Sequence, residues 1–154
     1  MKYDIYKTTN RNTIKKIIMQ DDIAENLLDN CKKELIDEFN VNIHRIMDRN
    51  LVIYIMRKYG IPVGIAFFTR QKDGSVKVDE AFSKNVRGKC AKELANLTLS
   101  AYIDEYKPCT LKGDILRKNK RALVFAKWLG FQVESSDEHK FYVVKKIKEE
   151  AWAA

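Results

Sequence analysis

The spacing of apolar residues changes along this chain, and that change limits the fold more than any other feature of the sequence. Leu51 to Phe82 contains three short runs of β-branched and aromatic residues, which are typical of strands. In Asp21 to Phe39 and in Gly88 to Tyr106, apolar residues instead recur every three or four positions, as in amphipathic helices. A chain that combines both spacings is expected to form an α/β domain with helices packed on a sheet.

The three runs predict an antiparallel meander. The first two, Leu51 to Lys58 and Ile61 to Thr69, are joined by the turn residues Tyr59 and Gly60 and therefore predict a hairpin. A second tight turn at Lys72 to Gly74 leads into the third run. One face of this third strand is predicted to carry Val76, Val78, Glu80 and Phe82.

Further strands and helices are predicted on both sides of the meander. Tyr3 to Lys7 precedes it as a strand, and a helix is expected to start near Thr13. After it come a strand at Cys109 to Leu116, a helix at Lys118 to Leu129 that ends at Gly130, and two strands at Phe131 to Val133 and Lys140 to Ile147. We expect a central, mixed and mostly antiparallel sheet of about six to seven strands flanked by about four helices.

A single domain accounts for the whole chain. No linker, internal repeat or low-complexity segment divides the 154 residues, and 45% hydrophobic residues suffice for one core. We expect one domain over residues 1–154, with residues 148–154 as a frayed tail. The longest apolar run, Leu51 to Met56, is too short to span a membrane, and the N-terminus does not resemble a signal peptide. Three cysteines cannot pair completely, which favours a soluble protein of the reducing cytoplasm.

The charge of the chain favours a polyanionic partner. Lys and Arg number 29 against 21 Asp and Glu, which gives a formal net charge of +8. Nucleic acid, anionic lipid and a phosphorylated cofactor all fit such a balance. A metal site is not expected, because the two histidines, His44 and His139, lie far apart without ligand-like neighbours.

One junction between a predicted strand and a predicted helix, Lys84 to Cys90, has the properties of an anion site. A helix start offers free backbone amides and the positive end of the helix dipole. Gly88 and Cys90 are small enough to let a phosphate approach the backbone. The nearby cations are Lys84, Arg87, Lys89 and Lys92. The alternative is a basic, exposed helix start that binds nothing.

Asn119 marks a second junction of this kind. It follows a predicted strand and precedes a helix, where its side chain can cap backbone amides or contact a ligand. The cations around it are Arg117, Lys118, Lys120 and Arg121. This cluster fits a solvated face as well as it fits an anion site.

Together, the two junctions resemble the motifs of the GNAT superfamily of acyl-CoA-dependent N-acyltransferases. In that family a strand leads into an R/Q-x-x-G-x-G/A loop whose amides hold the pyrophosphate of coenzyme A. Asn85 to Cys90 is similar, with Asn and Cys at the first and last positions. A later family segment, an Asn followed by a short helix ending in Gly-Phe, is similar to Asn119 to Phe131. The order of predicted elements from Tyr3 to Lys146 matches the same fold.

The resemblance implies an enzyme that transfers acetyl from acetyl-CoA, its co-substrate, to an amine by direct attack in a ternary complex. The acceptor would be a small molecule, or a lysine or N-terminus of a protein, and no metal would take part. The residues that the resemblance places at the cofactor are Phe82, Arg87, Gly88, Lys89, Cys90, Ala91, Asn119 and Phe125.

One position departs from the family pattern. Many members carry a Tyr four residues before the Gly of the Gly-Phe pair, where it protonates the leaving thiolate, and this chain has Ala126 there. The departure favours an alternative, a catalytically inactive GNAT-fold phage protein with a structural or host-interaction role that binds nucleic acid or protein through its basic surface. Small basic GNAT-like proteins occur among bacteriophage gene products, which implies a location in the host cytoplasm or the virion.

Two carboxylates on the third strand of the meander are candidates for the catalytic base. Glu80 interrupts an apolar stripe, and burial there would raise its pKa and suit a base that takes a proton from an ammonium group. In the resembling family, a Glu near the end of this strand often has that role. The alternative is an edge position where this face meets solvent. Asp79 points to the opposite face and is the second candidate, while water, Tyr102 or Tyr142 would protonate the thiolate.

Overall fold

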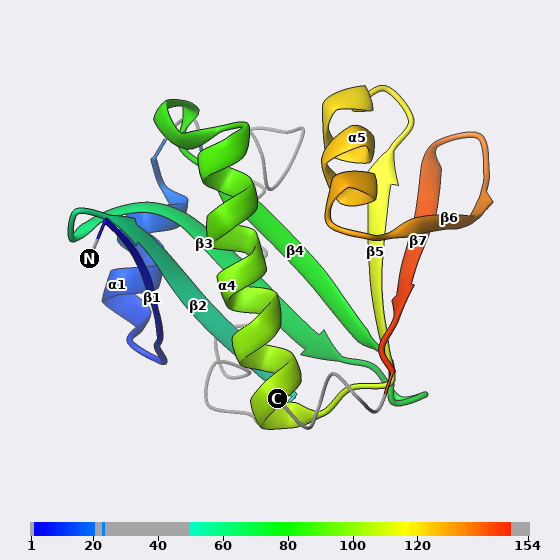
Figure 1. Cartoon of the computed structure of the whole chain (residues 1–154), viewed down its shortest axis with the longest axis horizontal. Coiled ribbons are helices and arrows are strands. Elements are labelled where there is room, and N and C mark those ends of the chain that lie inside the picture. Colours follow the sequence, from blue (N-terminus) through cyan, green and yellow to red (C-terminus); the bar gives the residue numbers. More distant parts are fainter. Residues whose placement is uncertain (1, 21–22, 24–49, 149–154) are drawn as a thin grey trace.

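The computed structural model describes residues 2–20, 23 and 50–148, which form one mixed sheet with helices packed on it (Figure 1). The strands are β1 (Tyr3–Lys7), β2 (Leu51–Lys58), β3 (Ile61–Arg70), β4 (Val76–Phe82), β5 (Thr110–Leu116), β6 (Gln132–Ser136) and β7 (Lys140–Lys146). The helices are α1 (Arg11–Ile18), α4 (Lys89–Tyr106) and α5 (Lys120–Trp128), with a short 3₁₀ helix, η2 (Lys84–Val86). Side by side, the seven strands run β1-β2-β3-β4-β5-β7-β6.

Strand β2 is buried on both of its faces because helices pack on both sides of the sheet. Val52, Tyr54 and Met56 belong to the core cluster under α4 and α5. Ile53 and Ile55, which point the other way, belong to the cluster under α1. This double burial explains the unbroken apolar run of the strand, because neither face needs a polar residue.

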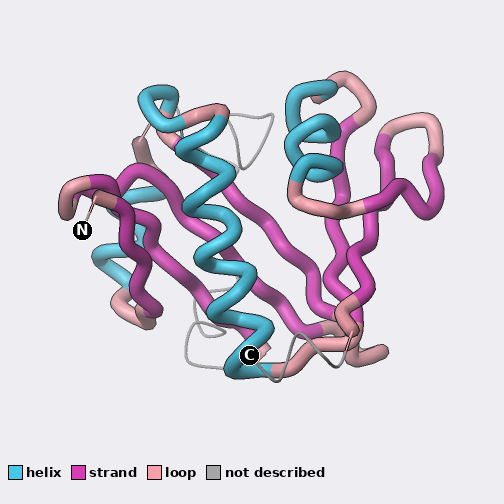
Figure 2. Tube along the Cα trace, in the orientation of Figure 1, coloured by secondary structure: helices cyan, strands magenta, loops and turns pink. Residues whose placement is uncertain are grey.

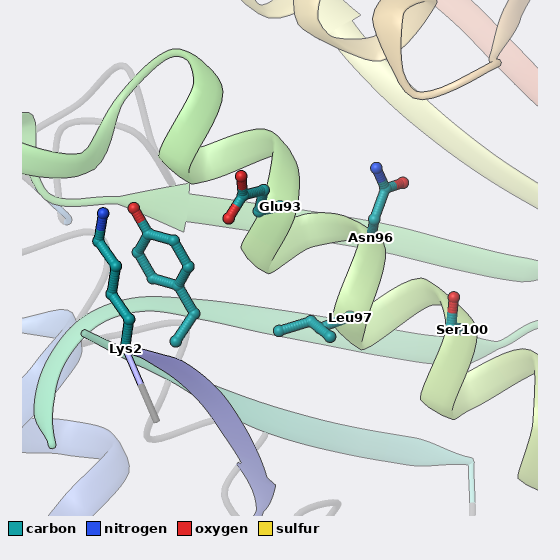
Figure 3. A pocket seen from close by; sticks show the side chains of 6 residues that line it. Lys2, Glu93, Asn96, Leu97 and Ser100 are labelled. Carbon is teal, nitrogen blue, oxygen red and sulfur yellow. The ribbon is translucent and has the colours of Figure 1, made fainter. Parts of the chain in front are cut away.

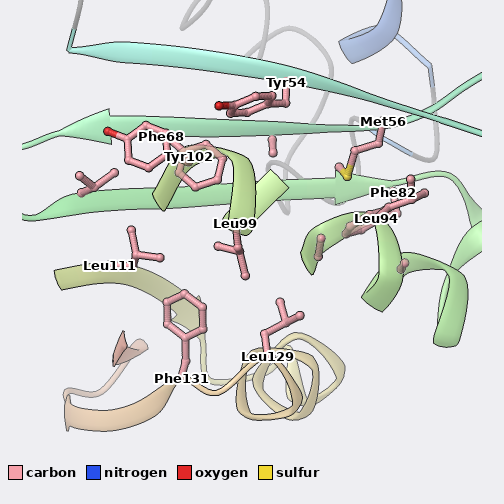
Figure 4. Close-up of a cluster of buried hydrophobic side chains, with 14 of the residues drawn as sticks. Tyr54, Met56, Phe68, Phe82, Leu94, Leu99, Tyr102, Leu111, Leu129 and Phe131 are labelled. Carbon is pink, nitrogen blue, oxygen red and sulfur yellow. The ribbon is translucent and has the colours of Figure 1, made fainter. Parts of the chain in front are cut away.

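Helix α4 lies along the sheet and supplies much of the main core (Figure 4). Its buried residues recur at helical spacing and are Ala91, Leu94, Ala95, Thr98, Leu99 and Tyr102. The Tyr102 ring stacks on Phe68 of β3, with the ring centroids 4.4 Å apart. Each large apolar side chain buried here stabilises the fold by about 1.5–3 kcal/mol.

Strands β4 and β5 separate soon after they begin. They are the only parallel neighbours among the described strands, and only Val76 with Leu111 and Lys77 with Lys112 are paired. Figure 2 shows the two strands close at one end and apart at the other. We call this place the strand fork. It divides the molecule into a first half, β1 to β4 with α1 and α4, and a second half, β5 to β7 with α5.

The structure confirms the predicted fold class and differs in details. The described residues contain three α-helices rather than about four, and the helix predicted at Asp21 to Phe39 lies outside them except for the buried Ile23. Helix α1 begins earlier than predicted, because the Asn10 side chain accepts a hydrogen bond from the Thr13 amide at 3.0 Å and caps the helix. No described helix is both long and apolar enough to cross a membrane.

The ends of the second half also differ from the prediction. Helix α5 begins after Asn119 rather than at Lys118, because that asparagine is its cap. The predicted strand start at Phe131 is wrong by one residue, since Phe131 turns into the core, and β6 continues to Ser136 through a bulge against β7. Gly130 has φ +96° and ends α5 as expected.

Candidate cofactor-binding and catalytic site

The loop between β4 and α4 leaves the first turn of α4 uncapped. Gly88, the residue before the helix, has φ +89° and ψ −134°, a conformation that residues with a Cβ rarely adopt. No side chain caps the helix, and its first hydrogen bond runs from the Lys92 amide to the Gly88 carbonyl at 3.0 Å. The helix therefore does not use the amides of Lys89, Cys90 and Ala91. Open space lies where a Gly88 side chain would be.

Hydrogen bonds to Ser83 and one buried side chain hold the loop between β4 and α4 in place. The Asn85 amide donates to the Ser83 hydroxyl at 3.4 Å, and the Val86 amide donates to the Ser83 carbonyl at 3.2 Å. The Val86 side chain is buried in the main core. Arg87 and Lys89 are exposed at the same loop, so the backbone is fixed while the charged side chains face solvent.

Cys90 has a partner that the sequence did not indicate. The Tyr3 hydroxyl donates a hydrogen bond to Cys90 Sγ over 2.8 Å, which ties β1 to the first turn of α4. This contact raises the pKa of Tyr3. The two residues lie 87 positions apart in the sequence, and no local pattern pairs them.

The second junction faces the first across the strand fork. Asn119 acts as a helix cap, with its Oδ1 accepting from the Ala122 amide at 3.1 Å. One turn further, the Phe125 ring meets the Phe82 ring edge-on, with the ring centroids 5.6 Å apart. The structure thus brings Phe82 and Phe125 together, although they come from opposite halves of the molecule.

The basic cluster at the second junction is partly engaged within the protein. The Arg117 guanidinium donates to the Asp137 carbonyl at 2.8 Å and lies 4.9 Å from the centre of the Phe141 ring. Lys120 and Arg121 are exposed. These contacts favour a structural role for Arg117.

The Glu80 carboxyl lies between β4 and α4. Burial affects its pKa more than its single hydrogen bond does. Thr98 of α4 lies 3.4 Å from Glu80 Oε1, and Glu80 Oε2 is buried without a hydrogen-bond partner. Burial raises the pKa of Glu80 to about 7; the charge of Asp79 also raises it, and the Thr98 contact opposes the rise. Glu80 Oε2 is therefore buried, as expected, while Glu80 as a whole residue is half-buried.

The Thr98 hydroxyl lies between two acceptors. It donates to the Ala95 carbonyl at 2.8 Å, and its contact to Glu80 Oε1 is longer, at 3.4 Å. The longer contact is the weaker hydrogen bond, so burial has the larger influence on the pKa of Glu80.

Asp79 lies on the opposite face of the sheet. Ala81, two residues along the strand and on the same face, belongs to the core cluster under α1. On this face, Lys77 of β4 reaches Asp114 of β5 at 3.3 Å and links the two strands of the fork. The two candidate bases, Glu80 and Asp79, thus lie on different faces of the sheet.

Neither candidate tyrosine is placed as an evident acid for the thiolate. Tyr102 is buried against Phe68 and Tyr106, and burial raises its pKa. The Tyr142 hydroxyl donates to Asp137 at 2.6 Å, and this bond raises the pKa of Tyr142. Both residues make contacts away from the first turn of α4, and Ala126 offers no ionisable group.

A groove of about 590 Å³ lies on the outer flank of α4, beside β1 (Figure 3). Its lining residues are Lys2, Tyr3, Glu93, Asn96, Leu97 and Ser100. None of the predicted site residues lines it. Within the described part of the chain, no group of three His, Cys, Asp or Glu side chains is placed to hold a metal ion.

The structure is similar to several solved N-acetyltransferases. The N-acetyltransferase PseH of Campylobacter jejuni, in complex with acetyl coenzyme A, superimposes with a TM-score of 0.71 at 16% identity, covering 95% of this chain and 99% of that one. A spermidine N-acetyltransferase SpeG variant from Vibrio cholerae gives 0.71 at 13% identity, with 94% of each chain covered. The ribosomal-protein-S5-alanine acetyltransferase of Vibrio fischeri gives 0.69 at 12% identity, covering 97% and 95%.

These likenesses establish the fold. No model of a known protein family matches the sequence, and a search of curated proteins finds no match. The chain therefore has the GNAT N-acetyltransferase fold, as its motifs led us to expect. At identities of 12–16%, the comparisons show the fold alone.

Proposed function

We propose that this protein is an acyl-CoA-dependent N-acetyltransferase whose site lies at the strand fork. The observation that carries the proposal is the uncapped first turn of α4, which follows β4 after the short loop with η2, at the end where β4 and β5 part. A helix start with free amides favours an anion. The neighbour with the same fold that holds acetyl coenzyme A supports this assignment.

The residues around the first turn of α4 fit the phosphate end of such a cofactor. The amides of Lys89, Cys90 and Ala91 are available as donors, and Arg87 adds positive charge. Gly88 leaves open space beside them. The Phe82 and Phe125 rings flank the fork, and the Asn119 cap fixes the start of α5.

The cofactor supplies an acetyl group already activated as a thioester, and the protein has to provide a base for the incoming amine. We assign that base to Glu80, because a carboxyl whose pKa lies near 7 is ionised in part at neutral pH and still accepts a proton well. Asp79 is the second candidate. With Ala126 at the usual tyrosine position, we assign protonation of the thiolate to water.

Turnover of the two carboxyl variants separates the candidates. Glu80→Gln is expected to keep acetyl-CoA binding and to lower turnover by about 100-fold, the typical share of a positioned base. Asp79→Asn changes charge by the same amount on the opposite face and is the matched control. A wild-type rate that survives Glu80→Gln between pH 6 and 9 and falls in Asp79→Asn would transfer the role to Asp79.

Two glycine variants test the cofactor site. Gly88→Ala and Gly74→Ala place a Cβ at similar φ values, +89° and +86°, with no atom within 4 Å in either case. Both variants therefore place a side chain at a positive φ, but only Gly88 adjoins the uncapped turn. Acetyl-CoA should raise the melting temperature of wild type and Gly74→Ala. An equal rise in Gly88→Ala would show that the ligand binds elsewhere.

Several finer expectations stay predictions. The acceptor amine is a small molecule, or a protein lysine or N-terminus. Only Ala126 favours the alternative of an inactive phage protein that binds nucleic acid or protein through its basic surface, and the similar structures do not support it. The phage origin and the host-cytoplasm or virion location likewise rest on the resemblance alone.

A further inference from the structure

Two side-chain contacts join the halves of the molecule at the open end of the strand fork. Phe82 at the end of β4 meets Phe125 of α5, and Phe125 in turn meets Trp128 edge-on at a centroid distance of 6.4 Å. Lys92 of α4 places its Nζ 4.4 Å from the centre of the Trp128 ring. We call Phe82, Phe125, Trp128 and Lys92 the aromatic bridge. It joins the halves where β4 and β5 no longer pair.

Lys92 belongs to both the bridge and the uncapped turn of α4. Its amide makes the first hydrogen bond of the helix, to the Gly88 carbonyl. Side chains on a helix lean toward its N-terminus. The Lys92 ammonium is therefore within range of an anion held by the first-turn amides, although in this structure it lies over the Trp128 ring.

The two contacts open to the Lys92 ammonium, with the Trp128 ring or with a phosphate, differ in strength. A cation–π contact at an exposed site contributes about 0.5–1 kcal/mol. A hydrogen bond from an ammonium to a phosphate contributes about 1.5–3 kcal/mol. Trp128 is 44% exposed as a residue, so its contact with the ammonium lies in a setting that solvent reaches. Lys92 would therefore bind a phosphate at the helix start in preference to the Trp128 ring.

We propose that Lys92 leaves the Trp128 ring to bind a phosphate of the ligand, so that occupation of the helix start releases the α4–α5 part of the aromatic bridge. The ligand class is a diphosphate or nucleotide phosphate. The proposal rests on the proposed function for the position of the phosphate. It adds Lys92 as a residue that recognises the phosphate. It also links phosphate binding to the loss of the Lys92–Trp128 contact between the two halves.

Acrylamide quenching of Trp128 tests the release directly. The chain has two tryptophans, Trp128 and Trp152, so Trp152→Phe leaves Trp128 as the sole tryptophan, whose fluorescence can be excited selectively. Inorganic pyrophosphate is the probe, because it carries the phosphates without a base or an acyl arm that would cover the ring. Saturating pyrophosphate should raise the quenching constant to the value that Lys92→Met shows without ligand. Lys127→Met, which removes an exposed neighbouring charge from α5, is the control and should behave as wild type.

Calorimetric affinities for pyrophosphate complete the test. Lys92→Met should weaken binding about 10-fold, the loss of one charged hydrogen bond. Trp128→Leu should strengthen it about 3-fold, because the ammonium no longer has to leave a ring; Trp128→Phe, which keeps a weaker ring partner, should fall between. Pyrophosphate that binds without changing the quenching constant would overturn the release of Lys92 while the phosphate site stands. Absence of binding would overturn both.

Discussion

The two halves that meet at the strand fork differ in how deeply they are buried. In the first half, β2 is covered on both faces, and α4 buries six of its side chains. In the second half, all five residues of β6 are exposed, and no residue of α5 is fully buried. Segments with few buried contacts open at the lowest cost in free energy. The second half is therefore the part that costs least to displace when a ligand enters the fork.

Matched leucine truncations test this inequality and carry the largest expected effect. Leu94 of α4 is 0% exposed, and Leu129 at the end of α5 is 7% exposed. We expect Leu94→Ala to lower the free energy of unfolding by about 4 kcal/mol and Leu129→Ala by about 2 kcal/mol, both within the usual range for such cavities. Urea denaturation measures both values. Equal losses, or a larger loss at Leu129, would contradict the comparison.

Glu80 provides a second test of the difference in burial between the halves, because it is a polar group inside the better-buried half. Its pKa is about 7 in the folded protein and 4.5 in the unfolded chain, so between these values the folded state holds a proton that the unfolded state has lost. The stability of wild type should fall by about 3 kcal/mol, relative to Glu80→Gln, as pH rises from 4.5 to above 7.

Urea denaturation of both proteins at pH 4.5 and pH 8 checks the sign and the size of this effect. The other titrating groups cancel in the difference between wild type and variant. A difference that does not change with pH would show that the Glu80 carboxyl is hydrated rather than buried against Thr98.

The smallest effect concerns how the second half is held together. Lys145 of β7 donates from Nζ to the Leu129 carbonyl at 2.8 Å and so satisfies the end of α5, while burial lowers its pKa. Lys145→Met should cost about 1 kcal/mol of stability, the typical worth of one hydrogen bond. Lys146→Met, on the exposed neighbour, is the control and should cost less. Hydrogen exchange in α5 should rise only in the first variant.

The sequence predicted the fold well because its cues are local. Three runs of β-branched and aromatic residues between Leu51 and Phe82, separated by turn residues, predict the meander. The Gly88 and Gly130 positions mark a helix start and a helix end through their backbone conformations. The residues around the first turn of α4 were also predictable, since a strand, a short loop with a glycine and a helix follow in this order along the chain.

Contacts between distant segments were beyond the reach of sequence reasoning. The environment of the Glu80 carboxyl depends on Thr98, which α4 brings against β4. Tyr3 meets Cys90 across 87 positions. The pairing of Lys92 with Trp128 requires α4 and α5 to pack on the same face. Each of these contacts follows from tertiary packing, which leaves no periodic signal in the sequence.

The amide resonances of the first turn of α4 test the central claim most directly. In a ¹⁵N-labelled sample titrated with acetyl-CoA, the account predicts that the largest shift changes fall on Gly88, Lys89, Cys90 and Ala91, whose amides lie at the uncapped helix start. Amides of α1, which packs on the opposite face of the sheet, should change least. Shift changes absent from Gly88 to Ala91, or confined to the basic residues 117–121, would contradict a cofactor site at the strand fork.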